Sequence, residues 1–367
     1  MNVSTAAPQG RASLLVNLGS PDSPAVPDIR RYLNQFLMDP CVIDLPWPLR
    51  RLLVSGCILP FRPARSATAW RSIWKEGEGF PLKAISQRLT EAVAARAQQP
   101  VRLAMRYGQP AMEQVILELA ALKEVDEILL FPMYAHYAMS SVGSCIEEAR
   151  RIFRRHNLRQ RLLVHPLFYR HPDYIKALLT GAQPFLDQLK RGEHDYLLFS
   201  YHGVPERHIR KDDSTGSHCL TAGCCERPSA AHERCYRHQL YTTTRLFVAA
   251  AGLTDDQWGL SFQSRLGKDK WLEPSTVQMM NELADKGVKN LLVICPGFTV
   301  DCLETLEEIR TEGRASFIAR GGKALTQIPC LNDAEHWAAL LAQWINSYPS
   351  MNGAATCNAS DACASVF

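Results

Sequence analysis

The sequence predicts an α/β fold of two doubly wound domains with parallel sheets. Short runs rich in Val, Leu, Ile and aromatic residues alternate with stretches of helical period, a pattern typical of parallel sheets that helices cover on both faces. The chain has 367 residues, and a domain usually takes about 150 residues. Seven or more strands on a chain of this length fit two sheets better than one.

The expected strands lie, in order, at residues 12–17, 101–107, 127–132, 161–166, 196–201, 258–263 and 290–295. The expected helices lie at residues 84–97, 111–122, 144–153, 174–189 and 276–285, with apolar N-terminal helices around residues 45–61. The strand spacing resets near residues 172–190, so we expect an N-terminal domain at 11–175, a C-terminal domain at 176–332 and a last helix at 333–347. Residues 1–10 and 348–367 lack any period and are expected to be flexible.

Composition and charge exclude several classes of protein. The net charge is +4, which leaves no strong positive field to bind nucleic acid. No apolar run approaches the roughly 18 residues of a spanning helix, and the N-terminus lacks the basic and apolar regions of a secretory signal. We therefore expect a cytoplasmic protein that does not bind nucleic acid.

Twelve cysteines are many for a reducing compartment, where they indicate metal or redox chemistry before disulfides. Six of them stand singly and are interpreted as small buried hydrophobic residues. Four others lie in residues 206–238, where Cys, His and charge break the α/β pattern: Cys219, Cys224, Cys225 and Cys235. Long loops of this kind are usually functional or disordered.

Chemically active residues follow the predicted strands, where ligands bind in open α/β sheets. His202 follows the fifth strand, and Glu304 and Glu308 lie in a helix after the seventh. An imidazole with a carboxylate suits proton transfer near neutral pH or loose binding of a divalent ion. The structural alternative is that His202 bonds only to backbone and that Asp301 forms a capping box with Glu304.

Aromatic residues also follow strand ends and are candidates for the wall of a flat aromatic ligand, with core packing as the alternative for each: Tyr107, Tyr134, Tyr137, Trp271 and Phe298. Neither a GxxxxGK[ST] loop nor a GxGxxG motif follows the first strand, which disfavours nucleotide chemistry.

Six motifs carry a resemblance to a known family. They are LLVNLGSPDSP, MRYGQP, FPMYAHYAMSSVGS, FSYHGVPER, FQSRLGKDKWLEP and CPGFTVDCLETLEEI. In this order and spacing they resemble the ferrochelatases, enzymes that insert ferrous iron into protoporphyrin IX. The match runs from about residue 12 to residue 346, and SYHG followed about 100 residues later by DCLETLEEI is highly specific.

The resemblance implies two Rossmann-like domains of the chelatase type with a porphyrin cleft between them. It places the family's invariant histidine on His202 and its essential glutamate on Glu304, as catalytic residues or ligands of Fe²⁺, with Glu308 continuing an acidic path. The substrate-binding residues that the match implies are Leu18, Arg106, Tyr107, Tyr134, Trp271 and Phe298.

Two departures from the family pattern matter. Many ferrochelatases have a second histidine two residues before the essential glutamate, but this chain has Cys302 there, so that histidine is not required or a thiol replaces it. Animal ferrochelatases bind an iron–sulfur cluster with one cysteine of the first domain and three near the C-terminus. Here Met139 takes the first position and the tail has only Cys357 and Cys363, so an animal-type cluster is not expected.

The insertion itself supplies four thiols in the pattern Cys219-x4-Cys224-Cys225-x9-Cys235, the number that a [2Fe-2S] cluster needs. It resembles bacterial ferrochelatases that carry an internal cluster after the histidine motif. A zinc ion bound by the four thiolates is the alternative, although the C-x2-C pairs usual in zinc sites are missing. A loop that binds no metal is the third interpretation. Adjacent Cys224 and Cys225 need a turn to reach one cluster, which Gly223 could provide.

The expected substrates are protoporphyrin IX and Fe²⁺. A haem or porphyrin carrier, or an iron–sulfur sensor, is the alternative, but a carrier needs no acidic path, so His202 together with Glu304 favours the enzyme. The apolar helices around residues 45–61, with arginines nearby, fit peripheral contact with the inner face of a membrane. A buried helix pair is the alternative, and the sequence indicates no particular oligomeric state.

Overall fold

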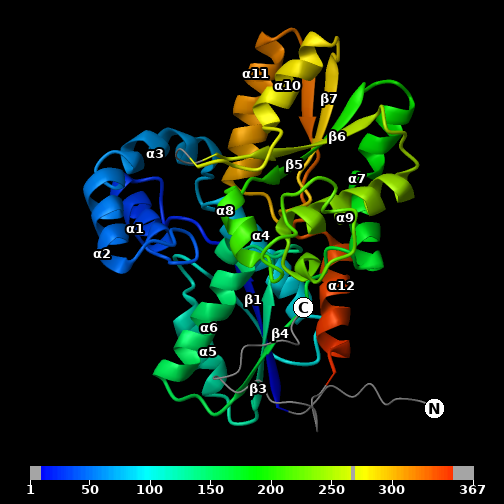
Figure 1. The fold of residues 1–367 in the computed structure, drawn as a ribbon. Coiled ribbons are helices and arrows are strands. Elements are labelled where there is room, and N and C mark those ends of the chain that lie inside the picture. The colour runs from blue at the N-terminus through cyan, green and yellow to red at the C-terminus, as the bar shows by residue number, and fades with distance from the viewer. Residues whose placement is uncertain (1–9, 266–268, 350–367) are drawn as a thin grey trace, which may run out of the picture. The chain divides into compact units, whose positions relative to one another are not determined.

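The computed structural model describes residues 10–265 and 269–349, which divide into two compact units (Figure 1). Unit 1 comprises residues 10–134, 139–167 and 333–349, and unit 2 comprises the described residues of 135–138 and 168–332. The last helix of the chain is therefore part of unit 1. Most of the two termini expected to be flexible, with Cys357 and Cys363, lies outside the described residues.

Unit 1 is built on a parallel four-stranded sheet of order β2-β1-β3-β4. Its strands are β1 (Arg11–Asn17), β2 (Val101–Met105), β3 (Glu127–Pro132) and β4 (Arg161–Val164). Its α-helices are α1 (Val26–Leu37), α2 (Trp47–Leu52), α3 (Arg62–Ile73), α4 (Pro81–Ala94), α5 (Met112–Ala120), α6 (Ser144–Arg155) and α12 (Glu335–Ser347), with π-helical turns at Leu53–Ile58 and Met139–Gly143. Every residue of β1 and β3 is buried, as in central strands covered on both faces.

Unit 2 has a second parallel sheet, of order β6-β5-β7-β8. Its strands are β5 (Tyr196–His202), β6 (Trp258–Gln263), β7 (Asn290–Ile294) and β8 (Ala324–Gln327). Its α-helices are α7 (Pro172–Lys190), α8 (Glu206–Asp212), α9 (Tyr236–Ala251), α10 (Thr276–Asp285) and α11 (Arg314–Ala319), with a 3₁₀ turn at Ala230–Glu233 and a π-helical segment at Glu304–Gly313. In both sheets the second strand along the chain lies at the edge, beside the first.

One core of unit 2 lies between its sheet and the helices that follow β6 and β7. Met280 of α10, Ile309 of the π-helical segment and Phe317 of α11 pack against Leu198 and Val293 of the two central strands. This packing fixes the segment Glu304–Gly313 against the sheet, so its first turn lies at the end where β5 and β7 finish.

The α/β class with parallel sheets is confirmed. Four helices lie outside the expected ranges: α1, α3, α9 and α11. Three further elements differ from expectation. The strand β8 was not predicted, because its sequence ALTQ is short and half polar. The helix expected around Glu304 is π-helical rather than α-helical. Residues 206–238, expected as an irregular loop, contain α8 and a 3₁₀ turn. No helix in the described part of the chain is long and apolar enough to cross a membrane.

Candidate active site

The carboxyl edge of the unit 2 sheet brings together the predicted catalytic residues. His202 is the last residue of β5 and pairs with Gln263 at the end of β6. The side chain of Gln263 donates to the backbone oxygen of Glu304 at 2.8 Å and reaches the carboxylate of Glu308 at 3.4 Å. The amide of Gln263 therefore ties the end of β6 to the helix that carries both glutamates.

The ring of His202 is oriented by the backbone of the next residue. Its Nδ1 lies 2.6 Å from the oxygen of Gly203, and because a carbonyl oxygen only accepts, Nδ1 carries the hydrogen. In the neutral ring Nε2 then has a lone pair, so it can accept a proton or bind a metal ion.

Trp271 packs on the turn that follows His202. A Cβ atom on Gly203 would lie 2.9 Å from the backbone oxygen of Gln263 and 3.2 Å from Cε3 of Trp271, so the close approach requires glycine. Trp271 is buried, and Phe298 is half-buried against the core described above. Of the predicted wall residues, Trp271 and Phe298 therefore lie in the unit that holds His202.

Glu308 is held by Ser264, the residue after β6. The backbone N–H of Ser264 donates to Oε1 at 2.7 Å, and its hydroxyl donates to Oε2. Ser264 has a φ of 65°, a left-handed conformation that costs free energy in a residue other than glycine. Burial raises the pKa of Glu308, and Glu304 raises it further, against opposing effects of Ser264 and His202. Glu308 therefore keeps a proton to higher pH than an ordinary glutamate.

The capping box considered for Glu304 does not form. The carboxylate of Asp301 accepts from Thr305 at 2.8 Å and from Asn332 at 2.7 Å, and no side chain caps the π-helical segment. Burial raises the pKa of the Cys302 thiol well above its ordinary value, and the nearby carboxylate of Glu304, which accepts a hydrogen bond from this thiol, raises it further. The position of the family's second histidine thus holds a neutral donor to Glu304.

The π-helical segment also decides which carboxyl groups are neighbours. In a π-helix the hydrogen bonds run from i to i+5, and the carboxyl group of Glu307 is hydrogen-bonded to that of Glu312. Burial, with the charges of Glu312 and Glu308, raises the pKa of Glu307 to about 7. The pairing of Glu307 with Glu312 was not predicted, because residues five positions apart do not face each other on an α-helix.

The predicted substrate residues of unit 1 also follow strand ends. Leu18 follows β1, Arg106 and Tyr107 follow β2, and Tyr134 follows β3. The backbone N–H of Tyr107 donates to the oxygen of Leu18 at 2.9 Å. A Cβ atom on Gly19 would lie 1.8 Å from the oxygen of Tyr107, so this close contact between the two loops depends on glycine.

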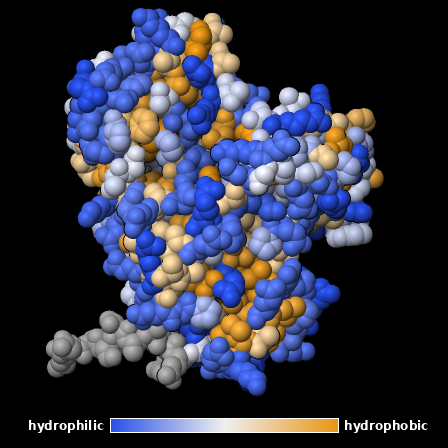
Figure 2. All heavy atoms as spheres, turned by 180° about the vertical axis from the view of Figure 1, so that it is seen from behind, coloured by the Kyte–Doolittle hydropathy of each residue, from blue (hydrophilic) through white to orange (hydrophobic). Residues whose placement is uncertain are grey.

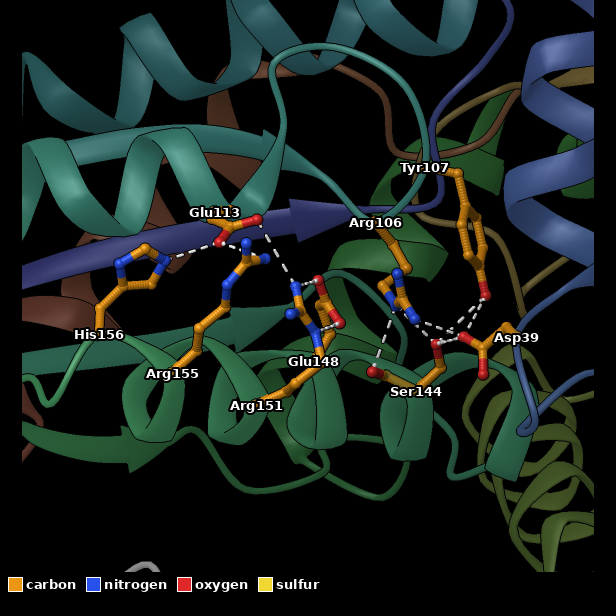
Figure 3. A network of polar contacts seen from close by, with 9 residues as sticks. All are labelled: Asp39, Arg106, Tyr107, Glu113, Ser144, Glu148, Arg151, Arg155 and His156. Carbon is orange, nitrogen blue, oxygen red and sulfur yellow. Dashed lines mark hydrogen bonds and ion pairs between the residues drawn. The ribbon is translucent and has the colours of Figure 1, made fainter. Parts of the chain in front are cut away.

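Arg106 and Tyr107 do not stand alone, because both bind Asp39 (Figure 3). Tyr107 is fully buried, and the guanidinium of Arg106 lies 4.5 Å from the centre of its ring. The hydroxyl of Tyr134 is buried without a hydrogen-bond partner among the described residues, and burial raises its pKa well above the ordinary value. Asp39 was not predicted because it lies outside the six motifs, and Ser144, the last residue of FPMYAHYAMSSVGS, was given no role.

The four cysteines of residues 206–238 gather in one part of unit 2. The sulfur atoms of Cys224 and Cys225 lie 3.9 Å apart, and the thiol of Cys235 is hydrogen-bonded to those of Cys219 and Cys225. Burial raises the pKa of Cys219 to about 11. The donor chemistry fits an iron–sulfur cluster, but across the described chain no three Cys, His, Asp or Glu side chains form a ready-made metal site.

A turn carries the adjacent pair Cys224 and Cys225, with Gly223 at a φ of 62°, the left-handed conformation that glycine adopts without strain. Three histidine rings donate N–H groups to the backbone oxygens of this pair: His218 and His232 to Cys224, at 2.7 and 3.0 Å, and His238 to Cys225, at 2.9 Å. These hydrogen bonds fix the backbone of the turn. Their histidines were not predicted in this role.

Comparison with known proteins shows the relationships of the chain. The family profile "Ferrochelatase" matches residues 10–348. The ferrochelatase of Stutzerimonas stutzeri (strain A1501) is 51% identical over 342 residues, which cover 92% of this chain and 98% of that protein. The ferrochelatase of Azotobacter vinelandii (strain DJ / ATCC BAA-1303) is 51% identical over 335 residues, which cover 90% of this chain and 97% of that protein.

A solved structure shows the same type of fold. SirB from Bacillus subtilis with Fe³⁺ has a TM-score of 0.51 and 10% identity, over 92% of this chain and 96% of that one. The relatives support a metal-inserting enzyme, and none supports a carrier or a sensor. Because the profile and relatives at 51% identity extend over nearly the whole sequence, the chain belongs to the ferrochelatase family.

Proposed function

We propose that in this ferrochelatase His202 and Glu304 act together at the metal, and that Glu308 relays protons or Fe²⁺. The observation that carries the proposal is the arrangement at the carboxyl edge of unit 2. There Nε2 of His202 has its lone pair available, and Gln263 links the helix of both glutamates to the end of the neighbouring strand.

Metal insertion needs three things from the protein. Two weakly acidic pyrrole N–H groups of a stiff, flat ring must lose their protons, the ring must bend, and a partly dehydrated ion must reach it. No electron is transferred. Nε2 of His202 can accept a proton or hold the ion, and Glu308, with its raised pKa, can carry a proton away from the site.

The remaining predicted residues are proposed to contact the macrocycle. Trp271, Phe298, Leu18, Arg106 and Tyr134 are proposed to do so directly. Their placement after strand ends supports this role, since ligands of open α/β sheets bind at that edge. Tyr107, being fully buried, would act through the surface that it supports.

The test is anaerobic incubation of the purified protein with protoporphyrin IX and Fe²⁺ or Zn²⁺, followed through the Soret band. We expect wild type to form metalloporphyrin, and His202→Ala to lose at least tenfold in rate, which is about 1.4 kcal/mol of barrier. His194→Ala is a matched control, because this histidine lies outside the proposed site and bonds to Gln188. A His202→Ala rate above a tenth of wild type would remove His202 from the mechanism.

We also propose that α2, α3 and the turn between them contact the surface of an anionic membrane. Four large apolar side chains in this part of unit 1 are between 56% and 68% exposed: Trp47, Leu49, Leu52 and Phe61. Residues 45–74 contain five arginines and no acidic residue. Such a surface favours anionic lipid through both apolar burial and charge. Figure 2 shows apolar residues at the outer edge of this part, on the right of the view.

The membrane proposal is tested by sedimentation with vesicles of phosphatidylcholine and phosphatidylglycerol. We expect the wild type to sediment at low salt and to be released as salt rises, because charge attraction is screened. The double variant Leu49→Ser/Leu52→Ser should stay in solution, whereas Ile318→Ser, an exposed apolar control in unit 2, should sediment like wild type. Equal sedimentation of both variants would contradict the proposal.

Finally, we propose that Cys219, Cys224, Cys225 and Cys235 bind a [2Fe-2S] cluster. Four clustered thiols and the histidine-braced turn support this. The sulfur atoms of Cys224 and Cys225 lie 3.9 Å apart, and a cysteine binds metal as the thiolate, so cluster binding has to displace thiol protons and separate these sulfur atoms. The cluster would order the insertion after the histidine motif, where ligand bonds offset chain entropy.

The cluster is tested by iron and acid-labile sulfide analysis, with a visible spectrum of anaerobically purified protein. We expect a brown wild type and colourless Cys224→Ser and Cys225→Ser variants, with Cys330→Ser as a coloured control. Stoichiometric zinc without visible absorption would replace the cluster by a zinc site. If a serine variant keeps the cluster, the substituted cysteine is not a ligand, and another residue, such as His218 or His232, binds the cluster in its place.

A further inference from the structure

A single buried carboxylate organises the substrate residues of unit 1. Oδ2 of Asp39 accepts hydrogen bonds from Nη2 of Arg106 at 2.5 Å, from the hydroxyl of Tyr107 at 2.8 Å and from the hydroxyl of Ser144 at 2.5 Å (Figure 3). Oδ1 accepts the backbone N–H of Cys41 at 2.7 Å. Four donors thus converge on one side chain that is only 3% exposed.

The carboxyl group of Asp39 remains charged in this environment. Burial alone would raise its pKa, but the guanidinium of Arg106 and the hydrogen bonds from Ser144, Cys41 and Tyr107 bring it below the ordinary value. Asp39 is therefore an anion at any working pH of the enzyme, and it neutralises Arg106 locally. Charge-assisted hydrogen bonds of this kind are short and directional.

The guanidinium of Arg106 is locked by two residues. Its Nε donates to the hydroxyl of Ser144 at 2.7 Å and to the backbone oxygen of the same residue at 3.2 Å, while Nη2 binds Asp39. Within residues 10–265 and 269–349, Nη1 has no hydrogen-bond partner, and the side chain is 12% exposed. One edge of the guanidinium is thus fixed by the protein, and Nη1 keeps hydrogen-bond donors that the described residues do not use.

Unit 1 contains a second buried carboxylate that serves as a comparison. Glu127 accepts two hydrogen bonds from Arg11, at 3.0 and 2.6 Å, and pairs with Arg161. Arg11 and Glu127 are the first residues of β1 and β3, at the end of the sheet opposite to the carboxyl ends. The Asp39 cluster instead joins the loop after α1 to the residues that follow β2 and to the start of α6, at the edge of an open α/β sheet where ligands bind.

We propose that Asp39 is a positioning residue for porphyrin binding in this ferrochelatase. Its carboxylate fixes the guanidinium of Arg106 and the ring of Tyr107, and it cancels a charge that would otherwise disfavour an apolar macrocycle beside it. The proposal rests on the role assigned above to Arg106 and Tyr107. It makes Asp39 and Ser144 part of the substrate site without contact with the reacting atoms.

The test compares Asp39→Asn with Glu127→Gln, two substitutions that remove one buried charge each from unit 1. Protoporphyrin affinity is measured by fluorescence quenching, KM and kcat by zinc insertion, and stability by thermal unfolding. We expect Asp39→Asn to raise the porphyrin Kd and KM at least tenfold with a smaller change in kcat. We expect Glu127→Gln to lower the melting temperature and to leave Kd and KM within twofold.

An unchanged Kd and KM in Asp39→Asn would overturn the proposal and leave Asp39 a purely structural residue. If that variant does not fold, Ser144→Ala replaces it, because this change keeps both charges and removes the bridging hydroxyl. It should raise KM in the same direction, and an unchanged KM would overturn the proposal. Arg106→Lys tests the assigned role of Arg106 separately from the role of Asp39. If Arg106→Lys leaves the porphyrin Kd unchanged while Asp39→Asn raises it, the role assigned to Arg106 is wrong, and Asp39 acts through Tyr107.

Discussion

At the scale of residues, the two glutamates proposed to be catalytic, Glu304 and Glu308, differ in how they are held. Both oxygens of Glu308 are bound by Ser264, whereas Glu304 receives a hydrogen bond from the neutral thiol of Cys302. A carboxylate fixed by two donors suits transfer of protons along a path. Glu304 has only this soft donor among the side chains of residues 10–265 and 269–349, which leaves lone pairs of its carboxylate for a metal ion.

We therefore predict that Glu304→Gln is far more damaging than Glu308→Gln. Glutamine keeps the shape of either side chain and removes its charge. A group that acts at the reacting atoms contributes about 10² to 10⁴ in rate, whereas Glu308 is proposed only to relay protons or Fe²⁺ from the next turn of the helix. The kcat of Glu304→Gln should fall at least about 100-fold and that of Glu308→Gln less than about tenfold. Zinc insertion measured by fluorescence gives both, with the exposed Glu282→Gln as control. Equal losses would show that the two carboxylates act as one unit.

The sequence predicted His202 and Glu304 because each follows a strand and lies within a motif. It did not single out Asp39, and it gave no role to Gln263 or Ser264, although both lie within the motif FQSRLGKDKWLEP. Their roles come from side-chain contacts across 40 or more residues of chain, such as the 41 residues between Gln263 and Glu304. No local period or spacing encodes such contacts.

At the scale of elements, the helix type of the segment Glu304–Gly313 could not be predicted from the sequence pattern. Its sequence ETLEEIRTEG suits an α-helix as well as a π-helix, because both bury Ile309 on one face. The choice is made by packing, in which Gly313 approaches within 3.4 Å of Met280, measured from an ideal Cβ position. The wider turn is what brings Glu307 and Glu312 together.

A buried histidine gives unit 2 a measurable dependence on acid. His136 lies against α9, where its Nε2 donates to the hydroxyl of Thr243 at 2.8 Å, and that hydroxyl donates to the backbone oxygen of Tyr169 at 2.7 Å. Burial lowers the pKa of His136 to about 3. The unfolded chain, with an ordinary histidine pKa of about 6.5, therefore binds a proton that the folded chain excludes.

We predict that the stability of unit 2 falls as pH drops from about 6.5 towards 3, by up to about 1.4 kcal/mol per pH unit from this residue. The folded pKa is the lower one, so the stabilisation is complete above 6.5 and is lost in acid. His136→Gln keeps a donor to Thr243 and removes the titrating group. Its melting temperature should vary less between pH 6.5 and 4.5 than that of wild type, as measured by circular dichroism. Parallel curves for the two proteins would refute this origin of the acid sensitivity.

At the scale of the whole molecule, the sequence predicted two doubly wound sheets because nearly every strand is a continuous apolar run. The strand β8 was not predicted, since only two of its four residues are buried. The sequence also did not predict that the two sheets share one strand order, because no sequence repeat accompanies it. The order of the strands depends on the apolar period and on the handedness of the connections, and many different sequences meet these two conditions.

The first strand and the last described residues of unit 1 are joined by one buried arginine. Arg11 is paired with Glu127, and it also donates to the backbone oxygens of Tyr348 at 2.7 Å and Pro349 at 3.0 Å. Its guanidinium lies 5.2 Å from the ring of Tyr348. The residues after α12 therefore depend on a side chain of β1, more than 330 positions away in the chain.

We predict that Arg11→Met destabilises unit 1 by about 3–5 kcal/mol, because it leaves Glu127 buried with fewer partners. Hydrogen exchange should rise in β1 and α12 together while the amides of β5 and β7 keep their protection. The double variant Arg11→Met/Glu127→Met should recover part of the lost stability, since an apolar pair has no uncompensated charge. If the double variant is as unstable as the single one, the lost stability comes from the contacts to Tyr348 and Pro349 and not from the buried carboxylate of Glu127.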